Sequence, residues 1–188
     1  FLGCTRLASV SLPSTLETWG ENVFMNCTDL TTLMISEGIT SIGSSAFYGC
    51  TNLTSLSLPS TLKGLDYKAF GNCTGLTSVV IPEGVTSTGS GVFSGCTRLA
   101  SVSLPSTLDS LSSCTFENCT SLTSIVIPEG VTYISSNPFR GCTRLVSVSL
   151  PSTLKNLDSN AFENCTGLTS IVIPEGVTRV GNYAFRGC

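Results

Sequence analysis

The stretch "TGLTSIVIPEGVTRVGNYAFRGC", residues 166–188, contains one complete unit of the fold. Leu168 and Ile171 are expected to point inward from an extended segment, while Ser170 and Val172 point outward. Pro174 lacks an N–H and so ends the ladder of that strand. The sequence Pro-Glu-Gly then predicts a turn, after which the chain returns to the core.

A single helical or 3-10 turn is predicted over residues 182–185. The position before it holds only residues that favour helix N-termini, which in the successive units are Gly20, Gly43, Asp66, Gly89, Ser112, Ser135, Asp158 and Gly181.

The unit repeats every 23 residues along the whole chain. Cysteines occur at 4, 27, 50, 73, 96, 119, 142, 165 and 188, and all nine phenylalanines share one column of the repeat. Residues 1–4 match the tail of a preceding repeat, so we expect the chain to be a piece of a longer protein. Eight repeats follow, and we number them in chain order: 5–27, 28–50, 51–73, 74–96, 97–119, 120–142, 143–165 and 166–188.

Odd and even repeats differ at the turn. Odd repeats read "LPSTL" and even repeats read "IPEGV", with "ISEGI" at 35–39. The array is therefore a duplication of a 46-residue pair. The residue before each cysteine is always Asn or Gly, the two residues that tolerate a positive φ, so this column indicates a requirement of the backbone.

One such repeat cannot bury its own apolar face, so the repeats must stack as rungs. Parallel strands lie about 4.8 Å apart, so eight rungs predict a single-domain rod about 40 Å long. Its core is predicted to be ladders of Leu, Val or Ile, Phe and Cys. Glu117, Arg140, Glu163 and Arg186 alternate in sign on successive rungs, which is expected to fix the register.

The pattern Cys-x-x-Leu-x-x-Val/Ile-x-Leu/Ile-Pro followed by Ala-Phe-x-x-Cys resembles the BspA-like leucine-rich repeat, over essentially the whole chain. The resemblance implies a repeat solenoid with one parallel strand and a short helical turn per rung. It also implies a secreted or surface-anchored protein that acts in adhesion or cell–cell binding. Departures from the pattern, chiefly Thr88 and Thr115, suggest local looseness in the core.

Composition excludes several classes of function. Charged residues make up 11% of the chain and the net charge is −3, without any basic run, so a nucleic-acid surface is not expected. No apolar run approaches the roughly 20 residues that cross a bilayer, so we expect no membrane insertion by this segment. The chain has no histidine, which removes the commonest general base and metal ligand. We expect no enzyme activity and no cofactor.

The cysteine column allows three interpretations. Zinc needs ligands that converge tetrahedrally, whereas a straight ladder presents parallel thiols. Disulfides between neighbouring rungs fit the Cα spacing but strain the Cβ positions. Buried thiols acting as small hydrophobes fit best. Cys114 lies outside the column and is predicted to be a free surface thiol, with pairing to Cys119 or to another molecule as alternatives.

Five sequons for N-glycosylation lie in the chain, at Asn26, Asn52, Asn72, Asn118 and Asn164. They apply only to a secreted eukaryotic protein. Four of them fall in the column where Asn exchanges with Gly, and Thr recurs in every repeat, so a turn-forming role is favoured.

The outward face of the strands is the clearest candidate binding surface. One column is almost entirely serine, and the next alternates serine with an apolar residue. An ordinary solvated β-surface and a docking face for a protein, a glycan or a neighbouring solenoid both fit this pattern. Tyr48 and Tyr67 form a second candidate patch. The candidate residues on the strands are Ser9, Thr32, Met34, Ser55, Ser78, Val80, Ser101, Ser124, Val126, Ser147, Ser170 and Val172.

We expect a non-enzymatic extracellular or cell-surface module that binds a protein or glycan in adhesion. The alternative is a structural building block that self-associates, either end to end or through the flat strand face, into a larger extracellular assembly. Uniform exposed columns favour the structural alternative, because a selective site normally has unlike residues at a few rungs.

Overall fold

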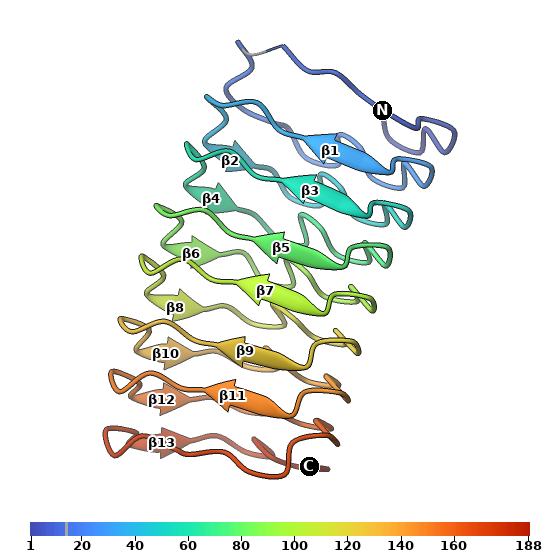
Figure 1. The fold of residues 1–188 in the computed structure, drawn as a ribbon. Coiled ribbons are helices and arrows are strands. Elements are labelled where there is room, and N and C mark those ends of the chain that lie inside the picture. The colour runs from blue at the N-terminus through green and yellow to red at the C-terminus, as the bar shows by residue number, and fades with distance from the viewer. Residues whose placement is uncertain (14) are drawn as a thin grey trace.

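The computed structural model describes residues 1–13 and 15–188, which form a rod of stacked rungs (Figure 1). Each regular rung has two short strands. One has three residues and is here called the outer strand; the other has two residues, lies behind it in Figure 1 and is here called the inner strand. The outer strands are β1 (Thr32–Met34), β3 (Ser55–Ser57), β5 (Ser78–Val80), β7 (Ser101–Ser103), β9 (Ser124–Val126) and β11 (Ser147–Ser149). The inner strands are β2 (Ser41–Ile42), β4 (Gly64–Leu65), β6 (Ser87–Thr88), β8 (Ser110–Leu111), β10 (Tyr133–Ile134), β12 (Asn156–Leu157) and β13 (Arg179–Val180).

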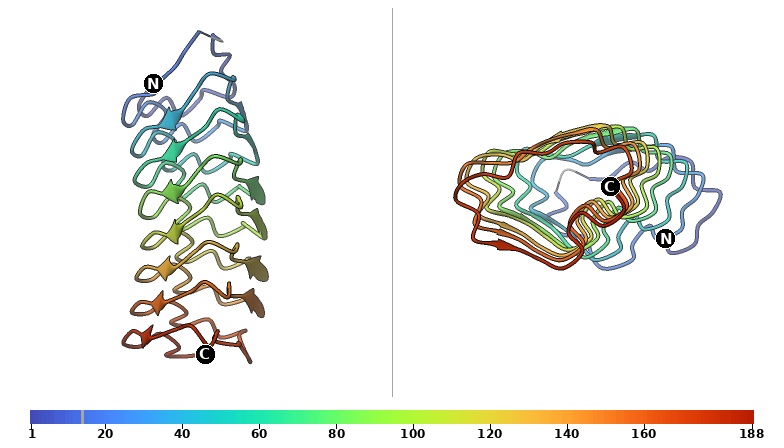
Figure 2. Two further views of the ribbon diagram at one scale, coloured as in Figure 1. Left: turned by 90° about the vertical axis from the view of Figure 1, so that its left-hand side faces the viewer. Right: turned by 90° about the horizontal axis from the view of Figure 1, so that it is seen from below.

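All strand pairs are parallel and follow the 23-residue register, such as Val79 opposite Val102. The parallel β-solenoid inferred from the repeat is therefore correct. Viewed along the rod, successive rungs superpose with a small progressive rotation (Figure 2).

The predicted count of eight regular rungs is wrong, because an outer strand forms in only six of them among the described residues. Outer strands pair only between an even rung and the odd rung that follows it: β1 with β3, β5 with β7, and β9 with β11. The first rung is odd and the last is even, so neither has such a neighbour within the chain. The solenoid thus has about six regular turns.

The predicted helical turn is also wrong, since no described residue is helical. Each segment before a cysteine instead makes hydrogen-bonded turns. The N–H of Phe93 donates to the carbonyl of Thr115 on the next rung at 2.9 Å, and that of Gly91 donates to Ser113 at 2.8 Å. A helix would need these donors within its own segment. These N–H groups donate to the next rung instead, so the turns cannot continue into a helix.

A column of positive φ angles accompanies these turns. It contains Asn22, Ser45, Lys68, Gly91, Cys114, Asn137, Asn160 and Tyr183, with φ between 51° and 68°. A left-handed residue in each segment interrupts any right-handed helix. From the sequence alone these positions look only exposed and polar. Lys, Cys and Tyr are not typical of the left-handed conformation, so the sequence does not reveal it.

The core follows the predicted ladders. Phe24 through Phe162 are fully buried, and neighbouring rings stack, as between Phe47 and Phe70 with centroids 5.2 Å apart and planes 3° apart. The seven cysteines from Cys27 to Cys165 in the column are buried, and each thiol donates to a phenylalanine carbonyl of the preceding rung, such as Cys119 to Phe93 at 3.2 Å. All ten cysteines are free.

Thr88 and Thr115 are buried and their hydroxyl groups are hydrogen-bonded, so the expected looseness of the core at these positions is not seen. Their hydroxyl oxygens lie 3.4 Å apart, and Thr115 also donates to the carbonyl of Ser112 at 2.7 Å. Ser112 in turn donates its hydroxyl to the carbonyl of Thr88. The two departures from the repeat lie on adjacent rungs and satisfy each other, which is what buried hydroxyl groups require.

Candidate functional site

The strand face consists of the exposed side chains of the outer strands and of the equivalent positions in the first and last rungs. Every residue of the serine column, from Ser9 to Ser170, is exposed. In the neighbouring column the apolar residues of the even rungs stand out most: Met34 is 79% exposed, Val80 and Val126 67%, and Val172 83%. All twelve strand residues predicted for the surface therefore lie together on one face.

Strand geometry produces this face. Successive residues of a strand point to opposite sides, so Val79 is buried while Ser78 and Val80 face solvent. Stacking of the rungs in the 23-residue register then places each column directly over itself on the next rung. The result is a row of methyl groups at every second rung, separated by the hydroxyl groups of Ser57, Ser103 and Ser149.

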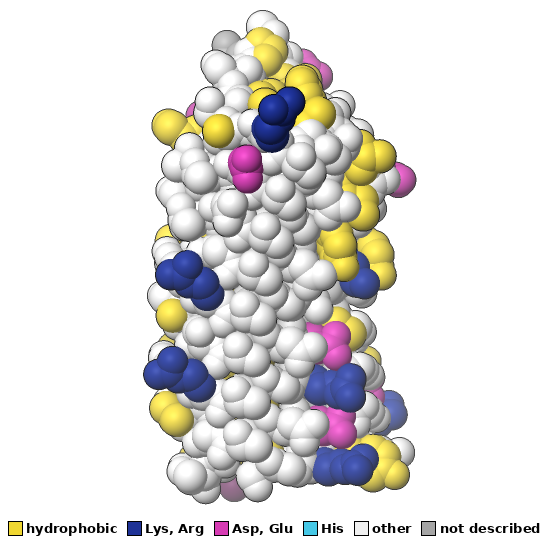
Figure 3. All heavy atoms as spheres, turned by 90° about the vertical axis from the view of Figure 1, so that its right-hand side faces the viewer, with side chains coloured by type: hydrophobic (Ala, Val, Ile, Leu, Met, Phe, Trp, Pro, Cys, Tyr) yellow, Lys and Arg dark blue, Asp and Glu magenta, His cyan; other side chains and the backbone are white. Residues whose placement is uncertain are grey.

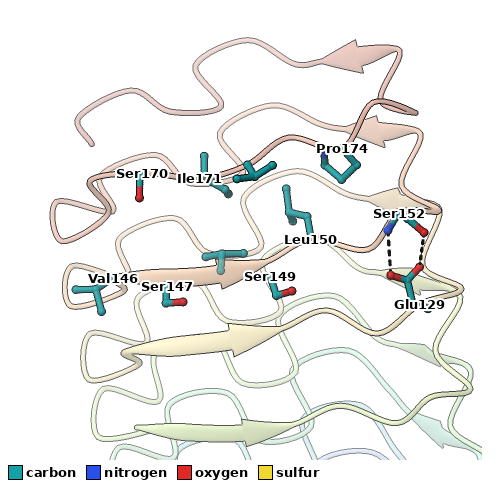
Figure 4. Close-up of a pocket in the computed structure, with 11 residues that line it drawn as sticks. Glu129, Val146, Ser147, Ser149, Leu150, Ser152, Ser170, Ile171 and Pro174 are labelled. Atoms are coloured by element: carbon teal, nitrogen blue, oxygen red, sulfur yellow. Dashed lines mark hydrogen bonds between the residues drawn. The ribbon is translucent and has the colours of Figure 1, made fainter.

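Among the described residues, two of the open grooves on this face each lie between an odd rung and the following even rung, where the outer strands are not paired. The larger, of about 580 Å³, lies between the seventh and the last rung and is lined by Ser147, Ser149, Ser170 and Val172 (Figure 4). The smaller, of about 280 Å³, is lined by Ser9, Ser11 and Met34 among others. The surface is therefore shallowly furrowed.

The turns after the even-rung strands carry Glu37, Glu83, Glu129 and Glu175, here called the glutamate border. Glu83 accepts hydrogen bonds from the backbone N–H of Ser106 at 3.0 Å and from its hydroxyl at 2.9 Å. Glu37 and Glu129 contact Ser60 and Ser152 in the same way, the latter visible in Figure 4. These bonds lower the pKa of all three carboxyl groups, with the backbone N–H as the main cause.

These contacts explain the alternation of "IPEG" and "LPST". The glutamate of an even rung binds the Ser-Thr turn of the next odd rung, and Thr107 completes the link by accepting from the N–H of Gly84 at 3.0 Å. Within a single repeat, each of these glutamates looks like an ordinary turn residue. The signal that could have paired them is their column, which holds Glu in even repeats and Ser in odd ones.

A neighbouring side of the rod, formed by the segments that precede each cysteine, is here called the phenylalanine edge. Figure 3 looks onto this side and shows basic and acidic side chains alternating down its lower right border. Arg140 contacts Glu163 at 2.9 Å and Glu117 at 3.2 Å, and Arg186 lies 3.7 Å from Glu163. The predicted charge ladder is therefore present.

Tyr48 and Tyr67 lie on the same edge and contact a common cation. The ammonium nitrogen of Lys68 lies 5.2 Å from the ring centroid of Tyr67 and 5.9 Å from that of Tyr48. Asn72 donates its amide to the Tyr48 hydroxyl at 2.7 Å. The two rings therefore lie close together, and their polar groups are engaged with neighbouring residues. A binding role for them stays a prediction.

Cys114 is partly buried and free, and burial is the main cause that raises the pKa of its thiol. A raised pKa reduces the thiolate fraction at neutral pH, so the group is a weak nucleophile. Among the described residues no group of three or more His, Cys, Asp or Glu is placed to hold a metal ion, and none forms a helix that could span a membrane.

The sequon residues Asn26, Asn72, Asn118 and Asn164 are exposed and have φ between 56° and 60°. The side-chain oxygen of Asn118 occupies the place where a Cβ on Gly141 of the next rung would lie, and the other three contact the next glycine likewise. Asn and Gly are therefore coupled between rungs and do not exchange freely. Glycosylation at these residues and at the exposed Asn52 remains a prediction.

Comparison with known proteins identifies one family of repeat proteins. The sequence matches the family described as "BspA type Leucine rich repeat region", in six copies over residues 1–90 and 63–188. The chain is similar to the crystal structure of a leucine-rich repeat protein from Bacteroides ovatus, with 35% identity and a TM-score of 0.91 over 96% of this chain and 47% of that one. The chain thus spans less than half the length of that protein.

Two further solved structures are similar. A leucine-rich repeat protein of T. pallidum has 30% identity and a TM-score of 0.79, over 85% of this chain and 77% of that one. A leucine rich cell surface protein from Faecalibacterium prausnitzii has 29% identity and a TM-score of 0.71, over 92% of this chain and 56% of that one. No curated protein matches the sequence.

Proposed function

Because the chain belongs to the BspA-type leucine-rich repeat family, we propose that it is a non-enzymatic binding module that mediates adhesion or protein–protein interaction outside the cell or at its surface. The naming of a similar protein as a cell surface protein supports this location. The binding surface is the strand face.

One observation carries the proposal. The strand face exposes a row of apolar side chains, Met34, Val80, Val126 and Val172, within a field of hydroxyl groups and without any charge. An uncharged face of this kind avoids the cost of desolvating charged groups and gains from the burial of its methyl groups. An extended, shallowly grooved surface of methyl and hydroxyl groups is complementary to another protein surface more than to a sugar, which favours a protein partner over a glycan.

Adhesion of beads coated with the chain tests this proposal. Coated beads would be mixed with one another and layered over an epithelial monolayer, and adhesion in either setting is the expected result. In the chain with Val80→Glu and Val126→Glu, adhesion should fall at least tenfold, because each change places an unpaired charge inside the contact.

The control is Ser90→Glu, which adds one charge on the same rung as Val80 but outside the strand face. Ser90 is exposed, and its column already contains Glu21. This variant should adhere like the original chain. Equal loss in the control and in the strand-face variant, or no adhesion of the original chain in either setting, would contradict the proposal.

A further inference from the structure

We propose that the partner of the strand face is the strand face of a second copy of this chain. The two rods lie parallel, with these faces in contact. This inference rests on the proposed function and names its partner. It corresponds to homophilic adhesion, and it follows from how charge is distributed along the two sides of the face.

Neither exposed column of the face, beginning at Ser9 and at Ser11, carries a charge, and the adjoining column that begins at Ala8 carries none either. Each column recurs every 23 residues. Charges begin only at its two borders. Such a surface does not repel its own copy, and the apolar residues of one copy can lie against the hydroxyl column of the other.

The two borders have opposite signs. The glutamate border carries four carboxylates, and the remaining charges of its turns, Glu17, Lys63, Asp109 and Lys155, cancel. The border before the strands carries Arg98 and Arg144, both exposed, while Arg6 and Asp29 cancel. Neither Arg98 nor Arg144 makes an ion pair or a side-chain hydrogen bond with any other described residue.

Symmetry selects one arrangement of two copies. A two-fold axis along the rod brings the glutamate border of one copy opposite the arginine border of the other. A two-fold axis across the rod would bring glutamates against glutamates, which is repulsive. Complementary charge therefore favours the parallel pair over the antiparallel one.

The spacing of the two borders also matches. Glu83 and Glu129 are 46 residues apart, and so are Arg98 and Arg144, which is two rungs or about 10 Å. Arg98 lies on the rung between the two glutamates, so in the parallel pair it faces both of them. Within the chain, Arg140 makes this contact, bridging carboxylates one rung above and one rung below at 3.2 and 2.9 Å.

The available area fits a reversible pair. A face about 40 Å long and about 15 Å wide offers about 600 Å² per copy, or about 1,200 Å² in total, the lower limit of specific interfaces. The carboxylates of the glutamate border retain free acceptor positions beyond those used by the serines. We therefore expect an association that is weak, dependent on concentration and sensitive to salt.

Sedimentation velocity across a dilution series tests the inference. Between about 1 and 200 µM in 50 mM salt, the chain should shift from monomer to dimer, and 500 mM salt should shift it back. The double variant with Arg98→Glu and Arg144→Glu should remain monomeric throughout. Val126→Glu, which changes the face and neither border, should weaken association at least tenfold.

The double variant with Lys63→Glu and Lys155→Glu is the matched control, since it changes the net charge equally but makes the glutamate border more acidic. It should dimerise at least as well as the original chain. Circular dichroism establishes that each variant is folded.

Monomeric original chain at every concentration, or unimpaired dimers of the arginine variant, would overturn the inference. Beads that bind the monolayer without binding one another would overturn this inference alone, whereas dimers without any adhesion would overturn the proposed function alone.

Discussion

The strand face and the phenylalanine edge arise from the same repeat, but their polar groups differ in what they contact. On the phenylalanine edge, Arg140 lies between two glutamates and Lys68 lies over two tyrosine rings. On the strand face, the hydroxyl and apolar side chains point to solvent. Periodic polar residues on the first surface hold the rungs together. On the second they contribute little to folding, so that surface is free to bind.

The largest difference should come from the packing beneath the two surfaces. Phe116 is fully buried behind the phenylalanine edge, and Phe116→Ala should lower the free energy of unfolding by about 3–5 kcal/mol. Val126→Ala on the strand face should change it by less than about 0.5 kcal/mol. Urea denaturation measures both, and a similar loss for the two variants would show that the strand face is part of the folded core.

A smaller effect tests the coupling of Asn and Gly on the phenylalanine edge. Gly141 has a φ of 74°, and a Cβ there would meet the side chain of Asn118. Gly141→Ala should therefore lower the free energy of unfolding by about 1–3 kcal/mol. Adding Asn118→Gly should recover part of that loss. Additive effects in this double-mutant cycle would mean that the two columns vary independently.

The left-handed column offers a stabilising change. Cys114 has a φ of 57°, which glycine adopts without strain. Cys114→Gly should raise the free energy of unfolding by up to about 1 kcal/mol, the relief of left-handed strain (about 1–2 kcal/mol) being partly offset by the entropy of the added glycine. Thermal unfolding measures it, and the same substitution at Ser101 of the strand face, where the conformation is extended, should instead destabilise. Destabilisation at both positions would contradict the role assigned to this column.

The smallest effect concerns the glutamate border. Hydrogen bonds lower the folded pKa of Glu37, Glu83 and Glu129, so their contribution to stability is present above the unfolded pKa of about 4.3 and is lost as the pH falls through the lower folded value. The triple variant to Gln should show a shallower fall of the melting temperature between pH 5 and pH 2. An unchanged slope would show that these bonds do not persist in solution.

The sequence alone was sufficient for the stacking, the register and the core, because these depend on the period of Phe, Leu and Cys. It was not sufficient for features that exist only between rungs. The predicted helix failed because the N–H of Phe93 bonds to Thr115 on the next rung. The pairing of Thr88 with Thr115 and of Glu83 with Ser106 likewise joins residues 27 and 23 positions apart. A single repeat contains only one member of each pair, so the contact cannot be seen within it.

The candidate surface was predictable as a set of exposed columns, because strand alternation determines which residues point outward. Its partner was not, because the relevant pattern spans both borders of the face. Arg98 and Arg144 look like scattered surface cations until stacking places them at the same spacing as Glu83 and Glu129.

The two methionines of the chain allow the most direct test of the central claim, that two copies of the chain dock through the strand face. Met34 lies on the strand face and is 79% exposed, whereas Met25 lies on the phenylalanine edge. In NMR spectra of chain labelled at the methionine methyl groups, the Met34 signal should shift and broaden between about 10 µM and 1 mM protein while the Met25 signal stays fixed. A shift of Met25 alone, or of neither signal, would contradict the account.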